Sequence, residues 1–407
     1  MSRGRAGGGA VAFPAVDRAI REMEGTAAGH YLHIGAVLEL DTTGRPPSLD
    51  EVRTHLRRRL RLLPPLAACA PHLDDHVREL TAPDGEPAAY DALLNIAPPR
   101  PQCPWGVWLV HDSVSDRQLL CYRGHHALHD GVSLARLIRR LFGLREPAHT
   151  TAPETTAATG PTGGAALTAH VRNAAASVRL LLPAPRRPLL PGARAGRRVL
   201  SAVTVPLAQV RVAAGELGTT VLGVHLAALS YAAQRTDATG WTTARRRPHG
   251  IAVPVSLAPT DPTPYAGNRF GVALLDAAWA EQDLGRRARM LSRQLERYRD
   301  PALKWALGDA LGRLDADGVC GLSERIYARC GVQTTVLPLA ADLGFAGRRA
   351  RRLTGLNCLP ANFPYQPVLA LCHDRAVCSF TADAATPGAR DLAPYWQEAL
   401  NRMAPPT

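Results

Sequence analysis

The residues best suited to chemistry lie together in one short segment, CYRGHHALHDGVS at 121–133. The imidazole of His126 is a candidate general base, because its ordinary pKa is close to working pH. Asp130 is near enough in sequence to orient an imidazole, or to hold the turn by pairing with an arginine. Gly131 gives the backbone the freedom that a tight turn needs. Together these residue types could remove a proton from a substrate.

Three other interpretations of the segment stay open. His125, His126 and His129 could bind a metal ion, although the rest of the sequence offers no obvious spacing of carboxylate or cysteine ligands. The segment could also be a polar loop with no chemical role. A Ser-His-Asp hydrolase is a weaker alternative, because the sequence contains no G-x-S-x-G pattern of the kind that exposes the nucleophile in such enzymes.

The elements on either side indicate how the segment is presented. An apolar run at 118–123 predicts a strand that delivers its last residues to a loop. A helix is expected at 132–142, with Asp130 as its N-cap and Ser133, a candidate substrate contact, in its first turn. Strand ends and helix starts can present polar groups without disrupting a core. We therefore expect a strand–loop–helix unit to carry the site.

The remaining pattern predicts two α+β halves at 1–145 and 199–407, with a flexible leader at 1–10. Between them, 146–198 is rich in Thr, Ala, Pro and Gly and is expected to be a linker with a helix at 165–182. Further strands are expected at 30–40, 73–80, 105–110, 199–205, 249–256, 270–278, 332–337, 353–358, 367–373 and 376–383. Further helices are expected at 14–24, 49–63 after a cap at Ser48, 206–216, 219–234, 281–307, 321–328 and 391–402.

Composition and charge narrow the class of protein. The chain has 407 residues, 46% hydrophobic and 20% charged, which fits a folded globular protein of two domains. Its formal net charge of +13 favours anionic partners, but the arginines are scattered and no nucleic-acid-binding motif accompanies them. Eight dispersed cysteines indicate reduced, buried thiols. With no apolar run of the roughly 20 residues that cross a membrane and no signal-peptide core, we expect a cytoplasmic protein that is free to contact a membrane peripherally.

The segment His125-His126-x-x-x-Asp130-Gly131 resembles the HHxxxDG signature of the acyl-CoA-dependent acyltransferase superfamily, which includes chloramphenicol acetyltransferase-like enzymes and nonribosomal condensation domains. More narrowly, the chain resembles the bacterial wax ester synthase/diacylglycerol acyltransferase family. The supporting blocks are HIGAV at 33–37, LDDHVR at 73–78, Pro104-Trp105, VPVSL at 253–257 and Gly267-Asn268. The resemblance implies two chloramphenicol acetyltransferase-like subdomains that form a V-shaped pseudodimer around a central substrate channel.

The resemblance also implies a mechanism. His126 would take the proton from a hydroxyl or amine acceptor, which then attacks the thioester carbonyl of an acyl-CoA or acyl-carrier-protein donor. Asp130 would be structural and paired with an arginine, with His125 and Gly131 in support. Asn268, or a backbone amide near Gly131, would stabilise the oxyanion. The thioester is a co-substrate, and no metal or other cofactor is implied.

Two stretches depart from the family pattern. Leu222-Gly223 stands where the family has an Asn-Asp pair, and TTVLP at 334–338 replaces an SNVPGP-like stretch. These departures favour a dedicated lipid or natural-product pathway over storage lipid. Two alternatives follow: a condensation-type, amide-forming enzyme acting on carrier-bound substrates, and a non-catalytic protein that binds a lipid or an acidic carrier protein.

Overall fold

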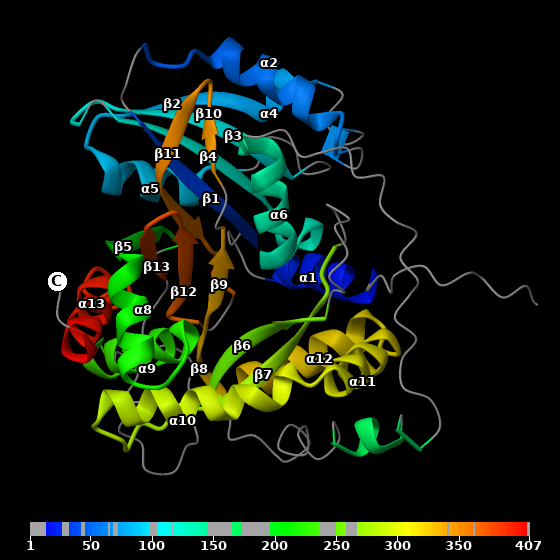
Figure 1. Ribbon diagram of the computed structural model, residues 1–407. Coiled ribbons are helices and arrows are strands. Elements are labelled where there is room, and N and C mark those ends of the chain that lie inside the picture. Colours follow the sequence, from blue (N-terminus) through cyan, green and yellow to red (C-terminus); the bar gives the residue numbers. More distant parts are fainter. Residues whose placement is uncertain are drawn as a thin grey trace, which may run out of the picture.

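The computed structural model shows two lobes (Figure 1). The described residues are 14–26, 32–41, 45–63, 66–67, 72–97, 104–115, 117–144, 164–165, 167–172, 196–236, 250–257, 267–339, 342–360 and 363–404. The predicted leader at 1–10, most of the predicted linker, Cys69 and Cys103 lie outside them. Helices and strands alternate through both lobes, so the predicted α+β class is confirmed.

The first lobe is built on a six-stranded sheet with the order β10-β11-β1-β4-β3-β2. Neighbouring strands are antiparallel except β2 and β3. Every residue of β1 is buried, which explains why its sequence is continuously apolar over 34–38 rather than alternating. The elements are α1 (Pro14–Thr26), β1 (His33–Leu40), α2 (Leu49–Leu60), α4 (Leu73–His76), β2 (Val77–Ala82), α5 (Glu86–Asn95), β3 (Trp105–Asp112), β4 (Arg117–His125), η1 (His126–Leu128), α6 (Gly131–Phe142), β10 (Gly344–Phe345) and β11 (Arg348–Leu356).

Local sequence explains where α2 begins. The Ser48 side chain accepts the backbone N–H of Glu51, and the Glu51 carboxylate accepts the backbone N–H of Ser48. This reciprocal capping box confirms the cap predicted at Ser48. The strand predicted at 73–80 is wrong in its first half, where LDDH forms the short helix α4. Asp74 of α4 pairs with Arg53 of α2 at 3.3 Å, a contact that the local pattern did not reveal.

The second lobe contains a four-stranded sheet, β5-β13-β12-β9, and a three-stranded sheet, β7-β6-β8. Its main core packs α8, α9, α10 and α13 against these strands, with Trp396 fully buried. The elements are β5 (Arg198–Pro206), α8 (Leu207–Glu216), α9 (Val221–Thr236), β6 (Gly250–Ser256), β7 (Phe270–Asp276), α10 (Leu284–Glu296), η2 (Arg297–Arg299), α11 (Pro301–Gly312), α12 (Ala316–Tyr327), β8 (Cys330–Gln333), β9 (Thr335–Pro338), β12 (Tyr365–Cys372), β13 (Arg375–Asp383) and α13 (Leu392–Met403).

Two predicted elements of this lobe are each divided in the structure. The helix predicted at 281–307 breaks before Pro301, which cannot continue a helix, and Asp300 caps the new helix α11 by accepting the N–H of Ala302. The strand predicted at 332–337 becomes β8 and β9, which lie in different sheets on either side of Thr334.

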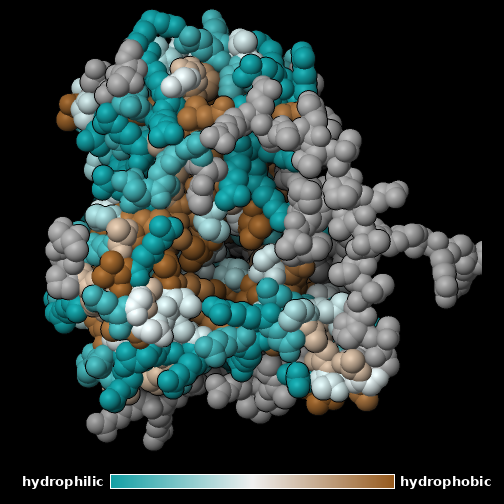
Figure 2. Space-filling view, viewed as in Figure 1, coloured by the Kyte–Doolittle hydropathy of each residue, from teal (hydrophilic) through white to brown (hydrophobic). Residues whose placement is uncertain are grey.

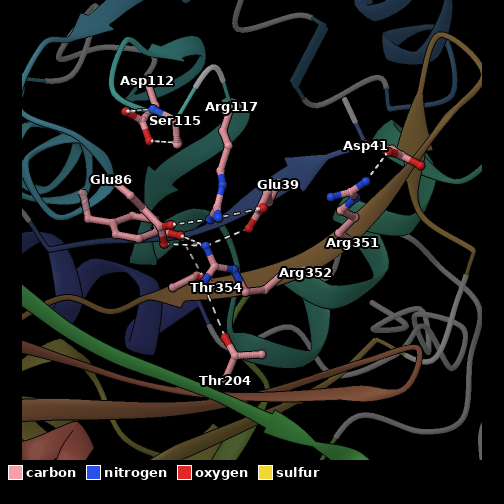
Figure 3. A network of polar contacts seen from close by, with 11 residues as sticks. Glu39, Asp41, Glu86, Asp112, Ser115, Arg117, Thr204, Arg351, Arg352 and Thr354 are labelled. Atoms are coloured by element: carbon pink, nitrogen blue, oxygen red, sulfur yellow. Dashed lines mark hydrogen bonds and ion pairs between the residues drawn. The ribbon is translucent and has the colours of Figure 1, made fainter. Parts of the chain in front are cut away.

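Strands from the later part of the chain complete the first sheet. β11 pairs with β1 along most of its length, and Figure 1 shows it rising from the second lobe into the first. Arg352 of β11 pairs with Glu39 of β1 at 2.7 Å and with Glu86 of α5 (Figure 3). The same guanidinium donates to Thr204 of β5 at 3.4 Å. Burial lowers the pKa of Arg352, but the neighbouring Tyr90, Glu86 and Glu39 outweigh burial and raise it overall. The first lobe thus includes residues from beyond residue 199, and the predicted domain boundary stays a prediction.

Two further expectations concern the state of the cysteines and the presence of membrane-spanning helices in the described part of the chain. The six described cysteines are free thiols; Cys320 is partly exposed and the other five are buried, as expected: Cys121, Cys330, Cys358, Cys372 and Cys378. No single helix among the described residues is long and apolar enough to span a membrane. Only α8 and α9 taken together meet that criterion, and they are bent by 97°.

Candidate active site

The histidine segment lies in the predicted strand–loop–helix unit. β4 ends at His125, a short 3-10 turn follows, and α6 starts at Gly131. The loop is anchored to strands on both sides: the N–H of His125 donates to Pro104 O at 2.8 Å, and the N–H of His126 donates to Leu32 O at 2.7 Å. These bonds fix the backbone of the two histidines.

His125 is buried and fully engaged. Its Nδ1 accepts the backbone N–H of Ala127 at 3.0 Å, so in the neutral ring the proton lies on Nε2. Nε2 lies 2.8 Å from Oε2 of Glu24 on α1. Burial raises the pKa of Glu24, but hydrogen bonds from His125 and Leu32 outweigh burial and lower it overall. Both ring nitrogens of His125 therefore hold the loop.

His126 has a different environment. Its side chain is partly exposed and lies beside Phe270, with ring centroids 6.1 Å apart. Burial lowers the pKa of His126, and the nearby His125 acts in the same direction. The backbone carbonyl of His126, the charge of Asp130 and the side chain of Asn268 oppose this effect without cancelling it. The imidazole is therefore neutral at neutral pH and can accept a proton.

Asp130 caps α6, as predicted. Its Oδ1 accepts the N–H of Ser133 at 2.8 Å, and its Oδ2 accepts the backbone N–H of Arg269 at 2.9 Å. Among the described residues no arginine side chain forms an ion pair with this carboxylate, and the expected pairing with an arginine stays a prediction. Each carboxylate oxygen thus accepts one backbone N–H, and Arg269 contributes its peptide group to the site. Ser133 is buried, and its hydroxyl donates to Gly267 O at 3.4 Å.

Asn268 joins the second lobe to the histidine loop. Its side-chain Nδ2 donates to the backbone O of His126 at 2.7 Å and to Oδ1 of Asp17 at 2.8 Å. Both amide hydrogens are therefore engaged, which leaves Asn268 without a free N–H for a substrate oxyanion. The geometry favours the other sequence candidate, a backbone amide near Gly131, because the first N–H groups of a helix have no intrahelical acceptor.

The start of α6 also approaches the second lobe directly. A Cβ at Gly131 would lie 3.1 Å from Cγ2 of Thr335 and 3.4 Å from Cδ2 of Leu337, both on β9. Figure 2 shows the visible face hollowed between the two lobes, with apolar residues bordering the hollow. In Figure 1, α1 and β9 lie at the height of this hollow. The site thus lies where the lobes meet, whereas the predicted substrate channel stays a prediction.

His129 is a packing residue in this arrangement. It is fully buried, its ring lies 5.6 Å from that of Tyr122, and burial lowers its pKa to about 3. A Cβ at Gly124 would lie 2.7 Å from His129 Cε1, so the glycine makes room for the ring. His125, His126 and His129 have different surroundings, and the described residues contain no group of three His, Cys, Asp or Glu side chains that could hold a metal ion.

Sequence reasoning missed two residues of the site, Asp17 and Glu24. Both lie on α1, and their side chains contact Asn268 and His125 respectively. Their spacing of seven places them on the same face of a helix, about two turns apart. Two acids at that spacing were the available signal, but their partners are 251 and 101 residues away in sequence.

Known proteins match this chain in three-dimensional structure but not in sequence. No protein-family model matches the sequence, and no curated protein matches it. The wax ester synthase/diacylglycerol acyltransferase from Marinobacter aquaeolei VT8 superposes with a TM-score of 0.64 at 18% identity, covering 95% of this chain and 98% of that chain. The first condensation domain of the calcium-dependent antibiotic synthetase gives 0.64 at 16% identity, with 98% and 96% covered. The trichothecene 15-O-acetyltransferase from Fusarium sporotrichioides gives 0.62 at 11% identity, with 97% and 93% covered.

The chain therefore has the fold that these acyltransferases and condensation domains share, and the expected fold is confirmed. The two lobes of the structure are consistent with the predicted V-shaped pseudodimer. Wax ester synthases and condensation domains are among the proteins that share the fold, as the resemblance of the sequence blocks implied.

Proposed function

We propose that the chain is an acyltransferase that moves an acyl group from a thioester donor to a hydroxyl or amine acceptor, with His126 as general base. One observation carries the proposal. Between the lobes, the loop holds a neutral, partly exposed imidazole whose backbone and neighbours are fixed by His125, Asp130 and Asn268. A preorganised base of this kind suits proton abstraction from a bound acceptor.

In the proposed reaction, His126 takes the proton of the acceptor hydroxyl or amine. The acceptor oxygen or nitrogen then forms a bond to the thioester carbonyl carbon. The resulting oxyanion is stabilised by backbone N–H groups at the start of α6, near Gly131. When the carbon–sulfur bond breaks, the protonated imidazole returns its proton to the sulfur, and a free thiol leaves with the ester or amide formed.

Several structural relatives support the choice of substrates. Their names describe a wax ester synthase, an acetyltransferase and condensation domains, one of them a starter condensation domain in complex with C8-CoA. Coenzyme A carries phosphates and carrier proteins are commonly acidic, so a net charge of +13 suits either donor. The second candidate is an amide-forming condensation enzyme that uses carrier-bound substrates, favoured by the likeness to the antibiotic-synthetase domain.

The test is thiol release from a panel of acyl-CoA and acyl-carrier-protein donors, each with alcohol or amine acceptors. Loss of a general base commonly costs about 10²–10⁴-fold, so His126→Ala should slow thiol release by that factor. His111→Ala is the matched control, because His111 lies at the far end of β3 and pairs with Glu79. Equal rates in His126→Ala and wild type would remove His126 as the base. Consumption of no donor would favour a binding protein that engages a lipid or a carrier protein.

A further inference from the structure

The helix α1 carries two acids on one face, one of which contacts His125 while the other contacts Asn268, the neighbour of His126. Glu24 contacts the ring of His125 directly, at 2.8 Å. Asp17 reaches His126 only through Asn268. Its Oδ1 accepts the backbone N–H of Asn268 at 3.1 Å and the side-chain Nδ2–H at 2.8 Å. The carboxylate therefore fixes both the position and the side-chain orientation of one asparagine.

The chemistry of the acceptors decides which way the Asn268 amide faces. A carboxylate oxygen and a backbone carbonyl only accept hydrogen bonds, so the NH₂ group must face both Asp17 and His126 O. The Oδ1 atom of Asn268 is then directed away from these two acceptors, and it is buried. The side chain of Asn268 also acts to raise the pKa of His126, against the larger lowering by burial.

Close packing leaves this arrangement little freedom. Asn268 is fully buried. Gly267 has a φ of +64°, in the left-handed region, and a Cβ there would lie 2.7 Å from Oδ2 of Asp17. On the other side, Asp130 accepts the N–H of Arg269 at 2.9 Å. The peptide groups at 268 and 269 are thus held between two carboxylates, one from α1 and one from the histidine loop.

We infer that Asp17 is a positioning residue for His126: it orients the Asn268 amide, and that amide holds the backbone carbonyl of His126. The inference rests on the proposed function of His126 and adds α1 to the machinery. Burial raises the pKa of Asp17, and the charge of Asp130 acts in the same direction. Hydrogen bonds from Asn268 and the charge of Arg21 oppose it. Substitution of Asn268 or of Arg21 should consequently change the pKa of Asp17.

The kinetic test is a double-mutant cycle between Asp17 and Asn268. Misplacing a catalytic group by about 1 Å can cost about 10²-fold, so Asp17→Ala should lower kcat by up to that factor with little change in KM. Asn268→Ala should do the same, and the double variant should be no slower than the slower single variant. Asp17→Asn keeps an oxygen acceptor and should recover most of the loss. Glu22→Ala, an exposed acid on the same helix, is the matched control.

Additive losses in the double variant, or an unchanged kcat in Asp17→Ala, would overturn the inference. If Asp17→Ala does not fold, Asn268→Leu removes the same Nδ2 group while keeping volume, and its kcat must fall with KM unchanged. A second readout needs no turnover: ¹⁵N shifts of the His126 ring, assigned with His126→Gln, should move in Asp17→Ala and stay in Glu22→Ala. If the wild-type protein consumes no donor, the proposed function is refuted. The ¹⁵N measurement still tests the role of Asp17, because it does not depend on turnover.

Discussion

Asp130 and Arg269 are joined by a 2.9 Å hydrogen bond in which the carboxylate accepts the backbone N–H of the arginine. The bond connects the loop after β4 with the residue before β7, 139 positions further along the chain. The other oxygen of Asp130 accepts the N–H of Ser133 in the first turn of α6. One aspartate thus caps a helix and holds a second-lobe segment against the histidine loop.

Replacing that carboxylate by an amide should lower both stability and activity. In Asp130→Asn one oxygen becomes an NH₂ donor that faces a backbone N–H, so one buried donor loses its acceptor. A buried unsatisfied group costs about 1–3 kcal/mol, and the free energy of unfolding in urea should fall by about that amount. Asp50→Asn, at a position whose side chain is 89% exposed, should change it by less than about 0.5 kcal/mol. Equal unfolding curves for Asp130→Asn and wild type would contradict the assigned role.

The pH dependence of acyl transfer should report the lowered pKa of His126. A general base works in its neutral form, so kcat/KM should rise with pH and level off above the pKa. Because burial moves the pKa of His126 down from 6.5, the half-maximum should lie below pH 6.5 and the rate should be flat from pH 7 to 8. The measurement is kcat/KM for thiol release from pH 5 to 8 with a non-ionising alcohol acceptor. A half-maximum above pH 7 would be incompatible with this environment.

The ion pairs of Arg352 with Glu39 and Glu86 should contribute far more to the free energy of unfolding than the ion pair of the neighbouring Arg351. Arg352→Met removes the cation between Glu39 and Glu86, whose side chains are only 11% and 20% exposed. Breaking a buried ion pair costs about 3–5 kcal/mol, and the remaining contacts of Arg117 with both glutamates should reduce this toward the lower end. Urea unfolding measures the change.

Arg351→Met serves as the comparison, because that side chain is 55% exposed and pairs with Asp41. An exposed pair contributes at most about 1 kcal/mol. Adding Glu39→Gln to Arg352→Met should recover part of the loss, since it removes a buried charge left with fewer cations. Similar losses in the two arginine variants would show that the cluster is not buried as described.

Gly223 should be intolerant of even a methyl group. A Cβ there would contact Ser292 and would lie 2.6 Å from Oγ1 of Thr219 and 3.0 Å from the backbone O of Ala288. The glycine therefore lets α9 pack closely on α10, which gives Gly223, the second residue of the departing pair, a structural reason. Gly223→Ala should lower the melting temperature, with a cost of about 1–3 kcal/mol. Gly321→Ala on α12, where nothing lies within 4 Å, should instead stabilise by up to about 1 kcal/mol.

Local signals in the sequence were sufficient for the elements around the site. The caps predicted at Asp130 and Ser48, each just before an expected helix, are both present in the structure. The helix predicted at 281–307 ran across Pro301, where the structure has a break. In that case the missing backbone N–H of proline decided the structure rather than periodicity.

What the sequence did not reveal depends on contacts between distant segments. The division at Thr334 arises because β8 pairs with β6 while β9 pairs with β12, and no local pattern distinguishes the two sheets. The roles of Asp17 and of the Arg269 peptide group depend on the way the lobes meet. The sequence did not identify an arginine partner for Asp130, and the contact that Arg269 makes with it comes from the backbone N–H, which no sequence pattern marks.

The strand order has a consequence for synthesis. β1 has β4 on one side and β11 on the other, and β11 ends at Leu356. While the ribosome is still making the second lobe, a nascent chain of 1–145 has β1 as an edge strand with one row of backbone groups unpaired. Such edges invite pairing with other chains. A separately expressed N-terminal half should therefore aggregate, because this edge of β1 stays open until β11 has been made.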